Sequence, residues 1–315
     1  MAADPSIGAW GVPLSMLGGA IRVSTPFIFV SLGETLTEKS GRINLGLEGT
    51  LVMGAMAGYA VSYYASDTSV FLAPWAGVIA AGMAGMVLGL LHAFLCARPR
   101  VNDVAVGIAL MLFGTGLAFF LGKPFIQPTA PRLPAIDFGF WSSVPQVREA
   151  LKVNMLFIIG CALAPAVYWA LKNTRYGMIL RTVGESADAA RAMGYSVNRV
   201  RMLATMAGGF LAGIGGSFLS LYYPGSWNEG LSSGQGLMAV ALVIFARWNP
   251  VYCVYAALLF GGAGAIAPAL QSIGIDKGRY LWAAAPYVLT LCIMVFTSAA
   301  GRQQFGIPAE LTVSR

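Results

Sequence analysis

Residues 72–96 read LAPWAGVIAAGMAGMVLGLLHAFLC and contain no lysine, arginine, aspartate or glutamate. An α-helix rises about 1.5 Å per residue, so about 20 apolar residues cross the roughly 30 Å of hydrocarbon in a bilayer. This stretch is long and apolar enough to cross a membrane as a single helix. Small residues spaced four apart let membrane helices approach closely. They recur along the chain and predict a tight bundle: Gly54 and Gly58, Gly85 and Gly89, Gly209 and Gly213.

Further apolar runs of this kind lie on both sides of the first. They cover residues 12–35, 45–65, 102–122, 153–171, 200–222, 233–247, 250–271 and 281–299. We therefore predict an all-α integral membrane protein, a polytopic helical bundle of about nine spans (eight to ten) that forms one domain over residues 1–315. The run at 233–247 is short and follows glycines, so it is predicted either to cross fully or to be re-entrant.

The composition excludes a water-soluble globule. Hydrophobic residues make up 57% of the chain and charged residues only 10%, with a mean hydropathy of +0.71, whereas soluble domains usually carry about 25% charged residues. The net charge of +7 does not predict a nucleic-acid partner, because the basic residues lie in short gaps between apolar runs. The four cysteines show no CxxC spacing, so we predict neither a metal site nor a disulfide framework.

The distribution of basic residues predicts the topology. If the polar segment 172–199 is cytoplasmic, 13 lysines and arginines fall on that side and 6 on the other. Membrane proteins keep their basic loop residues inside, so we predict an external N-terminus and a cytoplasmic C-terminus. The second long polar gap, 123–152, is then external, and its five prolines predict an irregular lobe. Such a lobe is either a connector or a docking surface.

The cytoplasmic segment contains a predicted short helix. Residues 181–194 read RTVGESADAARAMG, in which Ser186 can cap a helix N-terminus and Asp188 lies in the first turn. Gly194 suits the left-handed residue just past a helix end. A helix of about two turns is marginal in water on its own, so another surface must hold it.

The side chains of this short helix favour a protein partner over the bilayer. Ala187, Ala190 and Gly194 share one narrow face of small groups, which we expect to fit a groove on another protein. The segment lacks the several large apolar side chains of an interfacial membrane anchor. An inert cytoplasmic turn is the alternative.

Here the sequence resembles a known family. Asp188-Ala189-Ala190-x-x-x-Gly194 resembles the EAAxxxG coupling motif of ABC importer permeases, with Asp in place of Glu. The flanking runs 175–185 and 194–201 look like the permease superfamily that serves ribose, branched-chain amino acids and nucleosides. The runs SGRINLGLEG at 40–49 and GLMAVALVIFARWNP at 236–250 are similar to its nucleoside and simple-sugar branch, and the likeness covers roughly residues 15–300.

The chain departs from the family pattern at two positions. Ala246 stands where the family usually has glycine, and Met111 stands where a polar asparagine is common. The second difference bears on the polarity of the pore, and so on the substrate more than on the mechanism.

The resemblance implies a transport subunit of an ABC importer in the bacterial inner membrane. Its partners would be a cytoplasmic ABC ATPase, a second permease subunit, an external solute-binding lipoprotein and membrane lipid. This chain would bind no cofactor, because ATP and Mg²⁺ would sit on the ATPase. The residues that the motif assigns to coupling with the ATPase are Glu185, Ser186, Asp188, Ala189, Ala190, Arg191 and Gly194.

Polar groups at membrane depth are costly and are candidates for function. Glu48 follows Asn44 in a glycine-flanked helix start, and a helix broken there would expose backbone polar groups to a water-filled path or to protein. A helix cap is the alternative. The candidates for the translocation pathway are Asn44, Glu48, Asn102, Asp103, Phe245 and Asn249.

Four polar and aromatic residues cluster near the outer end of the sixth span, and they form either an external gate or an interfacial belt: Tyr222, Tyr223, Trp227 and Asn228. Arg22 lies mid-span and is expected to pair with an acid such as Glu34 or to reach outward. His92 is expected to be a satisfied residue at a helix end.

The sequence does not predict an enzyme. It contains neither HExxH nor GxSxG, and Pro124 follows Gly122-Lys123 where a nucleotide-binding loop needs Ser or Thr. We predict a permease subunit for a neutral polar solute, first a nucleoside and then a simple sugar. The alternative is an ion-coupled secondary transporter or channel, which would need acids deep in broken helices; only Glu34, Glu48 and Asp103 come near that requirement.

Overall fold

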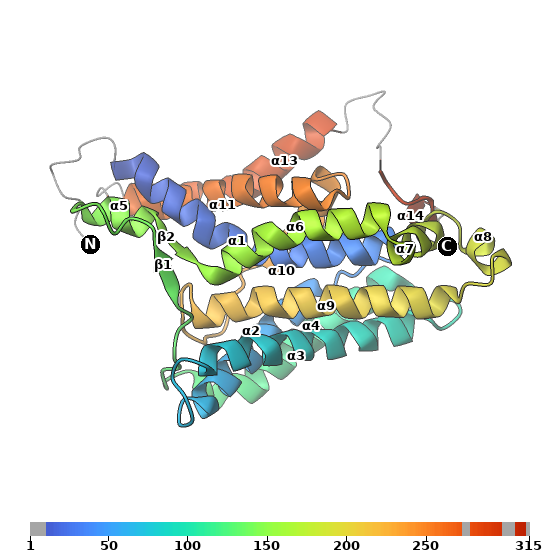
Figure 1. Ribbon diagram of the computed structural model, residues 1–315, viewed down its shortest axis with the longest axis horizontal. Coiled ribbons are helices and arrows are strands. Elements are labelled where there is room, and N and C mark those ends of the chain that lie inside the picture. Colours follow the sequence, from blue (N-terminus) through green and yellow to red (C-terminus); the bar gives the residue numbers. More distant parts are fainter. Residues whose placement is uncertain (1–10, 273–277, 298–305, 313–315) are drawn as a thin grey trace.

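The computed structural model describes residues 11–272, 278–297 and 306–312, and in these the chain is mostly helical, with one short pair of strands and with turns and loops between the elements (Figure 1). The long helices run roughly side by side along the longest axis of the molecule. The elements in chain order are α1 (Gly11–Lys39), α2 (Leu47–Ala65), α3 (Ala73–Cys96), α4 (Asp103–Gly122), η2 (Lys123–Phe125), β1 (Ala135–Asp137), α5 (Pro145–Ala150), β2 (Lys152–Asn154), α6 (Met155–Asn173), α7 (Arg175–Glu185), α8 (Ala187–Ala192), α9 (Val197–Leu221), α10 (Gln235–Phe245), α11 (Pro250–Ser272), α12 (Arg279–Ala283), α13 (Ala285–Thr297) and α14 (Ala309–Thr312).

The predicted helical membrane bundle is confirmed in class, but the count of about nine spans is not confirmed. Within the described residues, six helices are long and apolar enough to cross a membrane: α1, α3, α4, α6, α9 and α11. Three further predicted spans coincide with α2, which has 19 residues, α10, which has 11, and α13, which has 13. The sequence boundaries agree with the helix ends because each apolar run is a local signal.

Glycines bring the central helices into backbone contact, as their spacing predicts. A Cβ atom added at Gly85 of α3 would lie 2.1 Å from the carbonyl oxygen of Gly209 on α9, and one at Gly54 of α2 would lie 2.6 Å from Gly213. Any larger residue would force these helices apart. Close approach of this kind gains dispersion contacts that larger side chains would prevent.

We expect Gly85→Val to lower the stability of the bundle, because no backbone shift within the α3–α9 contact makes room for its side chain. Overpacking of this kind costs about 1–3 kcal/mol. Gly116→Ala on α4 is the matched control, since a Cβ there meets nothing within 4 Å. Thermal unfolding in detergent measures both, and equal midpoints would contradict the packing argument.

The lobe between α4 and α6 is more ordered than predicted. Strands β1 and β2 pair antiparallel, with Ala135 opposite Asn154 and Asp137 opposite Lys152, and α5 lies between them in the chain. The expectation of a wholly irregular lobe is therefore wrong. Asn154 explains part of the order: its side chain caps α6 by accepting from Leu156 N and donates to the carbonyl of Pro134.

The two ends of the bundle carry different elements (Figure 1). The lobe with β1, β2 and α5 lies at the end where α1 begins, and α7, α8 and α14 gather at the other end. The described start of α1 and the C-terminal helix α14 thus lie at opposite ends. The prediction of an external N-terminus and a cytoplasmic C-terminus requires this relative placement.

The predicted seventh span, 233–247, coincides with α10, a helix of 11 residues. Turns and bends at residues 222–234 precede it, and they begin beside the lobe, where Leu133 N donates to the carbonyl of Leu221 at the end of α9. Helix α10 ends next to Trp248, whose indole donates to the Glu38 carboxylate near the end of α1. Helix α10 is shorter than the six helices that are long enough to cross a membrane.

Candidate functional site

The short helix predicted in the segment 172–199 is present as α8, and both of its ends are capped as expected. The Ser186 hydroxyl accepts from Ala189 N at 3.2 Å. Gly194 adopts φ +83°, and the amides of Gly194 and Tyr195 donate to the carbonyls of Arg191 and Ala190 at 2.9 and 3.0 Å. This Schellman arrangement satisfies the last carbonyls and ends the helix at a fixed point.

The expectation about the contact face of α8 is wrong. Ala187 and Ala190 are 3% and 0% exposed, because they pack against Val183 of α7 and Val197 of α9. The small side chains thus let α8 lie close to its own chain. The outward face carries instead the residues Asp188, Ala189, Arg191, Ala192 and Met193, with an ion pair of 2.5 Å between Asp188 and Arg191.

The C-terminal helix α14 holds the start of α8, a contact that the sequence did not predict. The Glu310 carboxylate accepts from Ala187 N at 2.8 Å and from the Arg201 guanidinium at 2.9 Å. Arg201 is buried in the first turns of α9 and also donates to the carbonyl of Ser40 at 3.1 Å. Ala309 N donates to Glu185 at 3.4 Å, so a second contact ties α14 to the end of α7. The carboxylate of Glu310 therefore links α8, α9 and the segment after α1.

We expect Glu310→Ala to release the start of α8. The change removes the acceptor of the Ala187 amide and an ion-pair partner of the buried Arg201, at a cost of about 2 kcal/mol. Hydrogen exchange of the 186–193 amides should accelerate, while exchange in α3 stays as in the wild type. Glu310→Gln, which keeps an oxygen for the Ala187 amide, should show a smaller effect. Unchanged exchange in the alanine variant would contradict this role.

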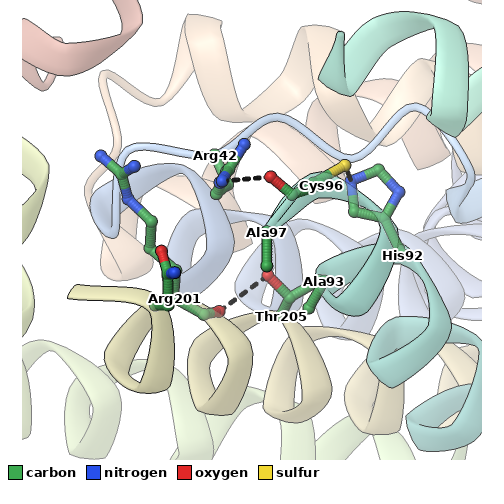
Figure 2. A pocket seen from close by; sticks show the side chains of 8 residues that line it. Arg42, His92, Ala93, Cys96, Ala97, Arg201 and Thr205 are labelled. Atoms are coloured by element: carbon green, nitrogen blue, oxygen red, sulfur yellow. Dashed lines mark hydrogen bonds between the residues drawn. The ribbon is translucent and has the colours of Figure 1, made fainter. Parts of the chain in front are cut away.

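A second ion pair lies beside this junction and joins the segment between α1 and α2 to the start of α4. Arg42 pairs with Asp103 and donates to the carbonyl of Cys96 at 2.5 Å (Figure 2). Arg42, Cys96 and Arg201 line one small pocket with His92 and Thr205. Asp103, a predicted pathway residue, is therefore placed against Arg42 at the end of the bundle that carries α8.

His92 lies buried near the end of α3, as expected. It is 1% exposed, and its Nε2 lies 3.5 Å from the Cys96 sulfur. The backbone of Ile43 also lies against its ring.

Glu48 joins the starts of two helices inside the bundle. Its carboxylate accepts from the Ser232 hydroxyl at 2.5 Å and from the amides of Gly234 and Gly236 at 2.9 and 2.6 Å. Glu48 lies in the first turn of α2, and the two glycines lie at the start of α10. A helix N-terminus carries partial positive charge and free N–H groups, so a carboxylate there is well placed.

This junction lies well inside the bundle rather than at its end. Helix α10 has 11 residues, so Gly234 stands roughly 16 Å along the helix axis from the end where Trp248 meets Glu38. The predicted glycine-flanked helix start is that of α2, and Glu48 joins it to the start of α10. The glycine-flanked acid was the sequence signal; its partners lie more than 180 residues away.

The other predicted pathway residues fall into two groups. Asn44 is buried beside Glu48, where its side chain accepts from Gly46 N and its amide donates to Glu34. Asn102 caps α4 by accepting from Val104 N and Ala105 N. Phe245 packs partly buried against the core, and Asn249 accepts from Val251 N at the start of α11. The structure thus places Asn44 with Glu48 and the remaining residues nearer the α8 end.

The predicted gate residues lie in the turns and bends that follow α9. Trp227 is 1% exposed, and its indole fills the space where Gly122 has no side chain. Tyr222 is partly buried. Asn228 is exposed. Tyr223 lies 6.0 Å from the Arg22 guanidinium, measured to the ring centre.

Arg22 pairs with Glu149 and not with Glu34, the acid that the sequence suggested as an example. Its guanidinium donates to the carbonyl of Glu149 at 2.8 Å and lies 3.8 Å from the Glu149 carboxylate. The expectation of Glu34 as partner is wrong, because Glu34 instead accepts from the amide of Asn44. Arg22 thus attaches the lobe to α1.

The described residues contain no group of three or more His, Cys, Asp or Glu side chains that could hold a metal ion. At the α8 end, Asp103, Asp188 and Glu310 form ion pairs with arginines. A bundle of long apolar helices in which a half-length helix begins inside the bundle, beside a buried carboxylate, is typical of membrane transport proteins.

Comparison with known proteins gives the family. The family model described as the branched-chain amino acid transport system permease component matches residues 16–298. The chain belongs to this family and is an ABC transporter permease.

The names of three relatives show a range of solutes within this family. The chain is 33% identical to a putative glucose ABC transporter permease protein of Haloferax volcanii, over 82% of this chain and 79% of the relative. It is 28% identical to a nucleoside ABC transporter permease protein of Lactococcus lactis, over 86% of this chain and 88% of the relative. It is 29% identical to a guanosine ABC transporter permease protein of Bacillus subtilis, over 89% and 90%.

Proposed function

We propose that this chain is the membrane-spanning subunit of an ATP-driven importer for a neutral polar solute, a nucleoside first and a simple sugar second, in the bacterial inner membrane. Its partners are a cytoplasmic ABC ATPase, a second permease subunit and an external solute-binding lipoprotein. The observation that carries the proposal is α8: a helix too short to stand alone, held rigidly by α7, α9 and Glu310, with a polar outer face at the end of the bundle.

The contacts of α8 describe how the ATPase could move the bundle. A force on its outer face reaches α9 through Val197 and Arg201, and it reaches the end of α1 through the Arg201 bond to Ser40. Helices α1 and α9 pack along each other through Gly33 and Gly208. ATPase closure then rocks these helices between two discrete packings of the bundle, since packed cores are bistable rather than continuously deformable.

The names of the relatives support an uncharged substrate. Glucose, guanosine and nucleosides in general are neutral and polar, and these are the solutes in the names of the relatives. Inside this bundle the carboxylate of Glu48 is occupied by three donors, which leaves little capacity there for a cationic solute. Two of the relatives name nucleosides, which favours a nucleoside.

Uptake into proteoliposomes tests the function. We expect the chain, reconstituted with its ATPase, second permease and binding lipoprotein, to import radiolabelled guanosine in an ATP-dependent manner, and to import glucose more slowly. The same vesicles without ATP, supplied with a proton or sodium gradient, are the control. Uptake driven by the gradient alone would overturn the proposal in favour of an ion-coupled carrier.

A further inference from the structure

A cleft of about 250 Å³ lies at the α8 end of the bundle, apart from the coupling helix and from Glu48. Four cationic side chains line it: Lys39, Lys172, Arg181 and Arg247. No aspartate or glutamate is among the residues that line it. The larger cavity beside Arg42 differs, because both arginines and carboxylates line it.

The four cations come from four separate parts of the chain. Lys39 ends α1, Lys172 lies in the last turn of α6, and Arg181 lies in α7. Arg247 lies in the turn between α10 and α11, where it adopts φ +51° and the next residue, Trp248, adopts φ +55°. The indole of Trp248 donates to Glu38 and fixes this turn. The fold thus gathers the four charges on rigid elements.

None of the four cations forms an ion pair within the described part of the chain. Lys39 donates to the uncharged carbonyl of Gly306 at 2.9 Å, and the Lys172 ammonium lies 5.6 Å from the centre of the Tyr168 ring. Glu185 and Glu38 attract the Lys39 ammonium from outside the cleft lining, but both carboxylates are held by other donors: Glu38 accepts from Trp248, and Glu185 accepts from Ala309.

Four like charges around one cleft repel one another, so an anion bound there would stabilise the arrangement. Lysine and arginine bind phosphate groups through charge-assisted hydrogen bonds. Such a phosphate group belongs either to a lipid headgroup or to a soluble molecule.

The surroundings of the cleft place it at the boundary between membrane and water. Exposed aromatic residues flank it on α6, α7 and α11, namely Tyr168, Trp169, Tyr176, Tyr252 and Tyr255. Aromatic side chains of this kind mark the headgroup level of a bilayer. Helix α7 lies at the ends of α6 and α1 (Figure 1), and exposed apolar side chains continue from the cleft along α6 and α11.

We propose that the cleft formed by Lys39, Lys172, Arg181 and Arg247 binds the phosphate headgroup of an anionic phospholipid, whose acyl chains lie on the exposed apolar surface of α6 and α11. Basic pockets at the membrane surface recognise such headgroups. In the proposed topology the lipid belongs to the cytoplasmic leaflet.

Native mass spectrometry of the purified full chain tests the site. Phosphatidylglycerol, phosphatidylcholine or inorganic phosphate is titrated into the detergent-solubilised protein. We expect Arg181→Gln/Arg247→Gln to weaken binding of phosphatidylglycerol about 25-fold, since each basic residue near a membrane surface contributes a factor of about five. Arg175→Gln/Arg199→Gln is the matched control, because it removes two exposed arginines from the same end of the bundle and should bind as the wild type does.

Two further variants separate the loss of charge from a failure to fold. Arg181→Lys/Arg247→Lys should restore most of the binding, because the charge is kept. If the double glutamine variant fails to fold, Lys172→Gln, which changes one exposed side chain, should still weaken binding about fivefold.

Three results would overturn the proposal. The first is equal affinity for phosphatidylglycerol and phosphatidylcholine, and the second is equal loss in the double glutamine variant and its control. The third is displacement of the lipid by inorganic phosphate, or by the ATPase subunit when it is added, which would assign the cleft to a soluble anion or to a protein partner. None of these results depends on uptake, so the site and the transport function fail or stand separately.

Discussion

Replacing Ala189 with arginine is expected to reduce ATP-driven uptake about tenfold or more while the chain still inserts and folds. Ala189 lies on the outer face of α8, and its exposed side chain contributes nothing to the packing against Val183 and Val197. A long cationic side chain at the centre of the proposed ATPase contact would hold the two proteins apart. Alanine and arginine are both good helix formers, so α8 itself should persist.

The measurement is uptake in proteoliposomes together with co-purification of the ATPase. Ala189→Ser keeps the residue small and is the matched control, with most of the uptake retained. We expect Ala189→Arg to lose the ATPase as well as the uptake, with an unchanged thermal midpoint. Normal uptake in Ala189→Arg would remove α8 as the coupling surface.

Ala190, which is buried on the same helix, is a poorer position for this test. Ala190→Arg would force a charge into the cluster of Val183, Ala187 and Val197, and so unfold the junction whether or not an ATPase binds there. Only a substitution on the outer face separates coupling from folding.

Sequence reasoning predicted what is encoded locally. The spans follow from runs of apolar residues, and the caps at Ser186 and Gly194 follow from residue types within one turn of the helix ends. Which face of α8 turns inward could not be read in the same way. Small residues suit a close contact with any neighbour, and here the neighbours are α7 and α9 of the same chain.

The sequence pattern could not predict contacts between residues that lie far apart in the chain. Glu310 and Arg201 are separated by 109 residues, and neither stands in a motif that names the other. Arg22 illustrates the same limit: an acid was expected, but the lobe that supplies Glu149 folds back onto α1 only in three dimensions. The acid at Glu48 was noticed because glycines surround it, whereas its partners lie in a different span.

Removing the carboxylate of Glu48 is expected to disrupt the junction between the starts of α2 and α10. Glu48→Ala leaves the Ser232 hydroxyl and the amides of Gly234 and Gly236 without an acceptor inside the bundle. Each buried unsatisfied group costs about 1–3 kcal/mol, so the total reaches several kcal/mol. We expect a large drop in the thermal midpoint in detergent and loss of uptake.

Glu48→Gln distinguishes two roles of Glu48: an anchor that joins the starts of α2 and α10, and a residue that lines the pathway. Glutamine keeps one acceptor oxygen but presents an NH₂ group to the remaining donors, so an anchor loses stability by an intermediate amount. A pathway residue would instead change the KM for the solute, with little change in the thermal midpoint. Because three donors already occupy this carboxylate, we expect the first result. An unchanged midpoint together with a shifted KM would show that the solute itself competes for Glu48.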